Sequence, residues 1–234
     1  ANGSNCTVVV RYAPVATGTL TDEIDITFND GAVGQTSSRG VQGTGVTPAL
    51  ITISESDPYD YGLIASGGNS SHSFTLTNSG NTVATALSES GIAAPYNYLG
   101  GSYPGTGGDC GVTLGIGASC TIVVEVSPVA LGAQLDTIDF SYNDGVGVVN
   151  VTRDIQGTSG APASLSISET DPYDYGTFAQ GSSNDHTFTI SNSGAVSATT
   201  VVDAGSMAAP FVFKGSTYPG TGGTCGASIA AGAN

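Results

Sequence analysis

The sequence predicts an all-β protein made of tandem β-sandwich domains, and three observations lead to this prediction. The first is an internal repeat, in which residues 1–49 match residues 115–163 and residues 50–114 match residues 164–229. The second is a recurrent alternation of apolar and polar residues with a period of two, which is typical of strands with one buried face. The third is a composition of 35 glycines, 10 prolines and only 10% charged residues, which favours short strands and tight turns over helices.

The two copies of the repeat align at a spacing of 114 residues over most of their length. The Asn-Asp-Gly sequence at 29–31 returns in this way at 143–145. After one inserted residue, the Tyr-Pro-Gly-Thr-Gly-Gly sequence at 103–108 returns at 218–223. A period of this length corresponds to a domain with its own core, so the chain is predicted to be a domain array and not a short solenoid repeat.

Individual strands and turns follow from the local sequence. Apolar side chains alternate with polar ones at 24–28 and 138–142, and shorter runs of the same kind occur at 8–12, 74–76 and 188–190. The two Asn-Asp-Gly sequences predict hairpin turns. The Pro104-Gly105 pair predicts a type II turn leading to a cysteine.

Gly- and Pro-containing segments at 43–48 and 157–162 separate the repeat units. They divide the chain into the later part of one unit (1–47), a complete unit (48–161) and the earlier part of another unit (162–234). We expect the complete unit to hold seven or eight strands, which fits an immunoglobulin-like β-sandwich. Neither partial unit has enough strands to bury its own apolar faces, and the two are expected to complement each other.

Four cysteines occupy equivalent repeat positions, Cys6 with Cys120 and Cys110 with Cys225. The spacing between Cys110 and Cys120 suits a bridge across adjacent strands, and no Cys-x-x-Cys pair favours zinc. We therefore predict a disulfide between these two residues, with buried reduced thiols as the alternative. Disulfides indicate an oxidising, extracellular compartment.

The sequence also resembles a known family. Three groups of residues carry the resemblance: Asp60-Tyr61-Gly62 followed by the run from His72 to Gly80, then Cys120 to Val124 with Ser127-Pro128, and finally Ile155 to Thr158. They resemble the choice-of-anchor D repeats of bacterial secreted and surface proteins, and also the related immunoglobulin-like domains of ciliary and centrosomal proteins. The resemblance implies a β-sandwich used in extracellular arrays, and its motif carries no catalytic signature. The cysteine pairs favour the secreted bacterial branch.

The charge of the chain excludes some classes of partner. Only four basic residues stand against 19 acidic ones, and the formal net charge is −15. Nucleic acids and anionic membranes both require clustered Lys and Arg. We therefore expect no nucleic-acid partner and no direct insertion of this segment into a membrane.

Two acidic segments are the only candidates for a bound cation. Each places three carboxylates within six residues, and the members are Glu55, Asp57 and Asp60 in one copy and Glu169, Asp171 and Asp174 in the other. Clusters of carboxylate oxygens hold Ca²⁺ in many proteins. The spacing differs from that of the Asp-x-Asp-x-Asp-Gly loop, however, and Asp-Pro commonly initiates turns. We expect a structural turn, keep Ca²⁺ as the alternative, and expect no other cofactor.

Other residues with chemical potential have simpler interpretations. His72 and His186 occupy the same repeat position at the start of a strand, and we expect them to pack there and not to act in catalysis. Tyrosines of the complete unit could form a sugar-binding face or belong to the core; they are Tyr59, Tyr61, Tyr96, Tyr98 and Tyr103. No constellation of residues supports an enzyme.

The partial units define the expected function. In repeat register, Cys225 of one copy faces Cys6 of the next, so copies of the chain are expected to join head to tail. Either the chain is a window on a longer tandem array, or separate protomers share strands. Both arrangements give an open filament, because a heterologous contact that does not close generates a fibre. We expect a structural fibre or stalk protein of a bacterial surface, with an adhesin that binds a carbohydrate or a host protein as the alternative.

Overall fold

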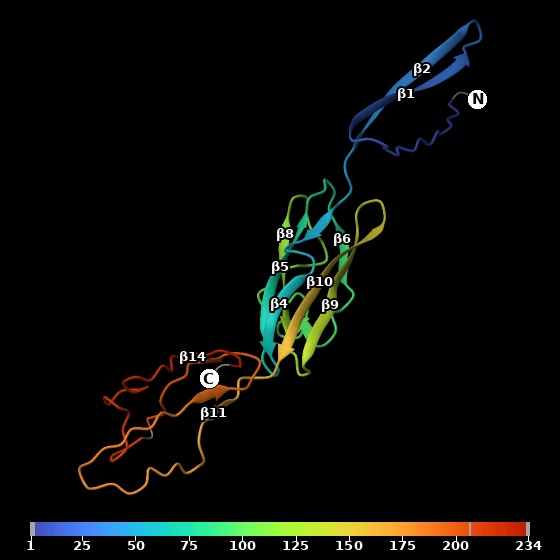
Figure 1. Ribbon diagram of the computed structural model, residues 1–234. Coiled ribbons are helices and arrows are strands. Elements are labelled where there is room, and N and C mark those ends of the chain that lie inside the picture. Colours follow the sequence, from blue (N-terminus) through green and yellow to red (C-terminus); the bar gives the residue numbers. More distant parts are fainter. Residues whose placement is uncertain (1–2, 206, 233–234) are drawn as a thin grey trace.

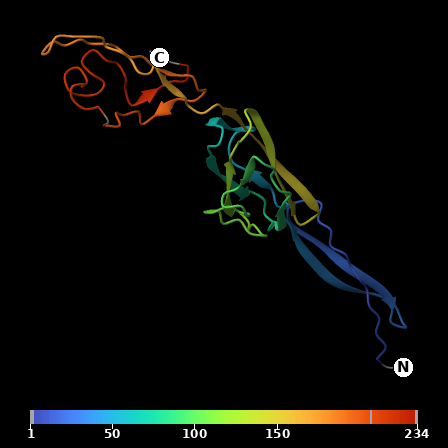
Figure 2. The same ribbon diagram turned by 90° about the horizontal axis from the view of Figure 1, so that it is seen from below.

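The computed structural model describes residues 3–205 and 207–232 and is all-β there, as the sequence predicts. Fourteen strands and no helix occur in these residues. Accordingly, none of the described residues forms a helix long and apolar enough to cross a membrane. In Figures 1 and 2 a central sandwich lies between an N-terminal hairpin and a C-terminal part with short strands.

Eight strands between residues 48 and 161 form two four-stranded sheets. The first sheet has the order β3-β5-β8-β7, and its pairs are antiparallel. Its strands are β3 (Ile51–Ile53), β5 (Ser70–Asn78), β8 (Ser119–Val126) and β7 (Tyr96–Tyr98). In this sheet β8, which comes late in the unit, lies between two strands that come early.

The second sheet has the order β4-β10-β9-β6. Its strands are β4 (Tyr59–Ala65), β10 (Val148–Gly160), β9 (Gly132–Asn143) and β6 (Thr85–Glu89). The pair of β10 with β4 is parallel, whereas β9 pairs antiparallel with both of its neighbours. Late strands thus occupy the middle of both sheets.

The alternating strands bury one face each, and these faces form a single core. On β5 and β8, Phe74 lies opposite Ile122 in the ladder, and both side chains are fully buried. The second sheet contributes Ile138, Phe140 and Ile155 from β9 and β10. Full burial of such a side chain stabilises the fold by about 1.5–3 kcal/mol, so the core depends on strands from both ends of the unit.

The Asn-Asp-Gly sequences form the hairpin turns that the sequence predicts. Between β9 and β10 the Asn143 side chain accepts a hydrogen bond from the Gly145 amide at 2.8 Å. The Asp144 carboxylate accepts two more, from the amides of Val146 and Gly147. The turn between β1 and β2 repeats this arrangement with Asp30.

A buried asparagine ends one strand in each copy of the repeat. Asn78 is fully buried, and its amide donates to the carbonyl oxygens of Thr82 and Leu114 while its side-chain oxygen accepts from Leu50 and Gly80. Asn192 makes the corresponding bonds in the C-terminal part. A buried side-chain amide with all its partners fixes the loops that meet there.

The N-terminal part is a single hairpin of β1 (Gly18–Asn29) and β2 (Gly34–Gly45), paired over its whole length. It copies the β9–β10 hairpin of the central sandwich, but its apolar side chains are largely exposed. The predicted strand at 8–12 is wrong for the chain by itself, because residues 4–14 form no strand. The equivalent residues in the centre belong to β8, which needs a partner on each side, and the N-terminal part has neither partner.

The C-terminal part contains two small antiparallel sheets. The first pairs β11 (Leu165–Ile167) with β12 (Ile190–Asn192), and the second pairs β13 (Ala198–Thr199) with β14 (Ser228–Ile229). The strand predicted at 188–190 is wrong in its first two residues, since β12 begins at Ile190. Residues 173–189, which correspond to β4 and most of β5, form no strand here. They lack the equivalents of β8 and β10.

Truncation of one core phenylalanine tests this difference between the centre and the C-terminal part. Phe74→Ala removes a fully buried ring, and we expect it to lower the free energy of unfolding of the central sandwich by about 3–5 kcal/mol. Phe188→Ala changes the same repeat position where the ring is exposed, and we expect a loss below about 1 kcal/mol in dilute, single chains. Urea denaturation followed by tyrosine fluorescence measures both. Equal losses would contradict the assignment of the core.

Candidate functional site

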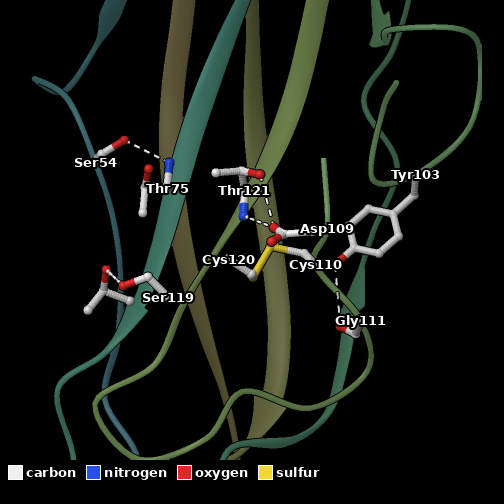
Figure 3. The surroundings of a disulfide bond; sticks show 10 residues. Ser54, Thr75, Tyr103, Asp109, Cys110, Gly111, Ser119, Cys120 and Thr121 are labelled. Atoms are coloured by element: carbon white, nitrogen blue, oxygen red, sulfur yellow. Dashed lines mark hydrogen bonds between the residues drawn. A yellow bond between two sulfur atoms is a disulfide. The ribbon is translucent and has the colours of Figure 1, made fainter. Parts of the chain in front are cut away.

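A disulfide joins the loop before β8 to β8 itself. Cys110 and Cys120 are bonded through their Sγ atoms, with their Cα atoms 4.9 Å apart, and both residues are buried. Figure 3 shows the bond beside Asp109, whose carboxylate accepts hydrogen bonds from the amide and the hydroxyl of Thr121 at 2.6 and 2.9 Å. The bridge and these bonds fix the loop onto the edge of the strand.

The loop that leads to the disulfide does not contain the predicted type II turn. The Tyr103–Pro104 peptide bond is cis, and the Gly105 amide donates to the Ser102 carbonyl oxygen at 2.8 Å. The Thr106 amide donates to the Leu99 carbonyl oxygen, so the hydrogen-bonded turn spans residues 102–105 with Pro104 third, and the prediction that placed Pro104 second in a type II turn was wrong. The aromatic residue before proline belongs to this turn, and Tyr103 packs edge-on against Tyr98.

Each histidine lies in an aromatic cluster, and the two clusters are equivalent in the two copies of the repeat. The ring of His72 stacks on Tyr59 with centroids 4.1 Å apart, and Phe74 meets it edge-on. His72 Nε2 lies 3.2 Å from the Glu55 carboxylate. His186 has the equivalent neighbours at similar distances. Because each ring is packed between a stacked tyrosine and an edge-on phenylalanine, the histidines have a packing role.

The candidate Ca²⁺ carboxylates of the central unit point to separate partners. Glu55 lies beside His72, Asp57 accepts from the Asp154 amide at 3.0 Å, and Asp60 accepts from the Gly62 amide at 2.7 Å. In the other copy Asp174 accepts from the Gly176 amide and Glu169 lies beside His186, while Asp171 has no hydrogen bond among those described. Within residues 3–205 and 207–232, no group of three or more His, Cys, Asp or Glu side chains is arranged to hold a metal ion.

The five tyrosines of the central unit pack into or against the core. Tyr96 and Tyr98 are buried, and the other three are partly buried. Burial raises the pKa of Tyr96 to about 12 and raises that of Tyr61 further. The Tyr61 hydroxyl donates to the Val124 carbonyl oxygen at 3.0 Å. These residues pack with the core, and the Tyr61 hydrogen bond connects β4 to β8 of the other sheet.

One residue was missed by sequence reasoning. Arg153, on β10, donates from Nη2 to the Ile53 carbonyl oxygen at 2.7 Å, and its Nη1 lies 3.8 Å from the Asp57 carboxylate. The guanidinium therefore connects β10 to β3 and to the loop before β4. The signal was present in the composition, since two of the four basic residues, Arg39 and Arg153, occupy the same repeat position.

The two partial units expose the residues whose counterparts form the central core. Val8 is 70% exposed, whereas its counterpart Ile122 is fully buried. Ile167 is 66% exposed, whereas its counterpart Ile53 is 4% exposed. The further exposed residues with buried counterparts include Val10, Ile26 and Phe28 in the N-terminal part and Leu165, Phe178, Phe188 and Phe211 in the C-terminal part.

The remaining two cysteines lie on these exposed parts. Cys6 is exposed and Cys225 is partly buried, and both are reduced within the single chain. They are the repeat counterparts of Cys120 and Cys110. The predicted bond between Cys225 and the Cys6 of a neighbouring copy stays a prediction.

Comparison with known proteins finds structural neighbours only. No protein-family model and no curated protein matches the chain. A protein of unknown function from Porphyromonas gingivalis W83 is similar at a TM-score of 0.35 with 11% identity, covering 62% of this chain and 67% of that one. The ASH/PapD-like domain 7 of human CEP192 is similar at a TM-score of 0.33 with 16% identity, over 49% of this chain and 88% of that one.

A protease is also among the neighbours. The VesB protease of Vibrio cholerae is similar at a TM-score of 0.34 with 25% identity, over 46% of this chain and 31% of that one. The neighbours thus include an ASH/PapD-like, immunoglobulin-like domain. With TM-scores below 0.5, none of these likenesses bears on activity or partners.

Removal of the disulfide should destabilise the central sandwich. The bridge closes a short loop, with a sequence separation of 10, and we expect Cys110→Ser with Cys120→Ser to cost somewhat under about 3 kcal/mol. The midpoint of urea unfolding measures the loss. Cys6→Ser with Cys225→Ser is the matched control and should leave the unfolding of dilute single chains unchanged. An unchanged urea midpoint without the bridge would contradict this expectation.

The Asp109 carboxylate should contribute to stability above acidic pH. Hydrogen bonds from the Thr121 amide and hydroxyl lower the pKa of Asp109. A carboxyl whose pKa is lower in the folded chain stabilises it fully above the unfolded value of about 3.9, and this contribution is lost as pH falls through the folded value. We expect Asp109→Asn to flatten the loss of urea stability between pH 6 and pH 3. Thr121→Val, which keeps the amide donor, should flatten it less. An unchanged pH profile in Asp109→Asn would show that the bonds do not contribute.

Proposed function

We propose that the chain is a structural subunit or segment of an extracellular bacterial fibre or stalk, built from disulfide-bonded immunoglobulin-like domains joined head to tail. In this proposal the C-terminal part of one copy receives the N-terminal part of the next copy, and the two together make one sandwich. The chain has no catalytic role in it. The same contact forms whether separate chains or consecutive segments of a longer chain supply the two parts.

The observation that carries the proposal is the matching exposure of the two partial units. Residues that are buried together in the centre are exposed separately in the N-terminal and C-terminal parts. Phe74 lies opposite Ile122 in the central ladder, and their counterparts Phe188 and Val8 are both exposed. Large apolar residues exposed at positions that are buried in the central unit are expected where a partner docks.

The disulfide supports the extracellular location. A bond between Cys110 and Cys120 forms and persists in oxidising compartments. In the proposed joint, Cys225 and the Cys6 of the next copy occupy the same two positions and would form the equivalent bond. Each joint would then be covalent as well as packed.

The geometry of the joint gives a filament. The two surfaces that meet are different parts of the chain, so each copy keeps one free donor and one free acceptor. Such a contact continues from copy to copy unless its rotation closes a ring. A strand supplied to a neighbour's sheet is a known mode of assembly, in which main-chain hydrogen bonds give affinity and side-chain pockets give specificity.

The assembly is tested with the purified chain. We expect light scattering to show masses that grow with protein concentration, and electron micrographs to show filaments with an axial repeat of one or two domains. Mass spectrometry without reduction should find Cys6 linked to the Cys225 of another chain. Monodisperse single chains at all concentrations, with both thiols free, would contradict the proposal.

A matched pair of variants distinguishes this joint from nonspecific association. Val10→Asp places a charge at the counterpart of fully buried Val124, and we expect it to weaken association at least about 30-fold, since the lost apolar burial alone is worth about 2 kcal/mol. Val15→Asp is the control, because Val15 is 99% exposed and its counterpart Val129 is also exposed in the sandwich. Equal effects of the two changes would contradict the proposed contact.

A further inference from the structure

The central sandwich assigns a residue-by-residue register to the joint between copies. In the β5–β8 ladder, Phe74 lies opposite Ile122 and Ser71 lies opposite Glu125. The repeat spacing places Phe188 opposite Val8 in the joint by the same rule. This register rests on the function proposed above, and it can be used to ask which charged residues meet there.

The first such contact between charged residues involves Arg39. Its counterpart Arg153 donates to the Ile53 carbonyl oxygen and lies beside Asp57. The corresponding acceptors in the C-terminal part are the carbonyl oxygen of Ile167 and the carboxylate of Asp171. Arg39 is exposed in the single chain, and the Asp171 carboxylate has no hydrogen bond or ion pair among the described contacts.

The second contact occurs at a ladder position where the two copies of the repeat have different residues. In the centre, Glu125 faces the uncharged Ser71 across the ladder. In the joint, the counterpart of Glu125 is Arg11 and the counterpart of Ser71 is Asp185. Both positions of the pair have changed together, and the result is an opposite-charge pair in place of an acid beside a hydroxyl.

The surroundings of Asp185 are open to such a partner. The Asp185 side chain is 61% exposed, with Lys214 Nζ 2.8 Å from one carboxylate oxygen. Its other oxygen is free of hydrogen bonds among the described contacts. In the central sheet, Asn97 of β7 pairs with Glu125 on the side of β8 that faces away from β5. Its counterpart Val212 would lie beside Arg11 in the joint, and it is uncharged.

We propose that Arg11 and Arg39 are the residues that select the partner and the register of the joint. Arg39 reaches Asp171 and the Ile167 carbonyl oxygen of the preceding copy, and Arg11 lies opposite the Asp185 of that copy. Opposite charges directly across a ladder stabilise pairing, and like charges destabilise it. A segment with the glutamate of β8 at this position would set Glu125 opposite Asp185 as a like-charge pair, whereas an N-terminal segment sets Arg11 there as an opposite-charge pair.

The test uses full-length chains with Cys6→Ser and Cys225→Ser, so that association is reversible. Sedimentation at low salt gives the association constant for each variant. We expect Arg11→Glu to weaken association about 5- to 30-fold, because it converts an opposite-charge pair into a like-charge pair. We expect Arg39→Met to weaken it about tenfold or more, since a charged hydrogen bond is lost.

A second substitution shows whether Arg11 acts through Asp185. Asp185→Ser in the Arg11→Glu chain recreates the Ser71–Glu125 pair of the centre, and we expect it to restore most of the lost affinity. Glu125→Gln is the matched control in the central sandwich, and it should change the association constant less than about twofold. High salt should reduce the difference between the native chain and Arg11→Glu.

The outcomes separate this inference from the function on which it rests. If the chain with its cysteines forms no filaments, the proposed function is wrong. If filaments form but Arg11→Glu associates like the native chain, or Asp185→Ser restores nothing, the charge pairing is wrong and the fibre stands. Loss of all association on removing the cysteines would also overturn the inference, since the disulfide and not the charges would then select the joint.

Discussion

The structure depends on one topological constraint, which is that strands from the end of each unit lie in the middle of its sheets. In the first sheet β8 separates β5 from β7, and in the second β9 and β10 separate β4 from β6. The strands β4, β6 and β7 at the edges therefore have no ladder without the late strands, whereas β3 pairs with the early strand β5. This explains why residues 173–189, which match β4 and β5 in sequence, form no strand, while the small sheets made only of early elements are present.

Local sequence predicted much of the fold because the elements concerned depend on near neighbours. The hairpin of β9 and β10 follows from alternation on both sides of an Asn-Asp-Gly turn, and the same signal gave the hairpin of β1 and β2. The segment at 8–12 has equally good alternation and forms no strand, because strand formation there requires partners from elsewhere. Periodicity records which face a residue would bury, and it says nothing about whether a partner is within reach.

The parts of the candidate site that escaped prediction are those that the residue types do not fix. Arg153 bonds to a carbonyl oxygen 100 residues away, and a backbone acceptor leaves no trace in the sequence. The turn at Pro104 is closed by a hydrogen bond from the Gly105 amide to the Ser102 carbonyl oxygen, and the residue types Pro and Gly do not fix which four residues form it. The histidines were correctly interpreted as packing residues, and their aromatic neighbours come from two segments that the repeat already showed to be constant.

The buried asparagine of the C-terminal part has a consequence for how a neighbour is received. Asn192 already bonds to Ser164, Val196 and Ile229 within the single chain, so this corner has the same hydrogen bonds as the complete sandwich. An incoming segment would meet a scaffold whose loops are ordered in advance, and less conformational entropy is then lost on docking. The ordering entropy lost on docking would then fall mainly on residues 173–189, which form no strand in the single chain.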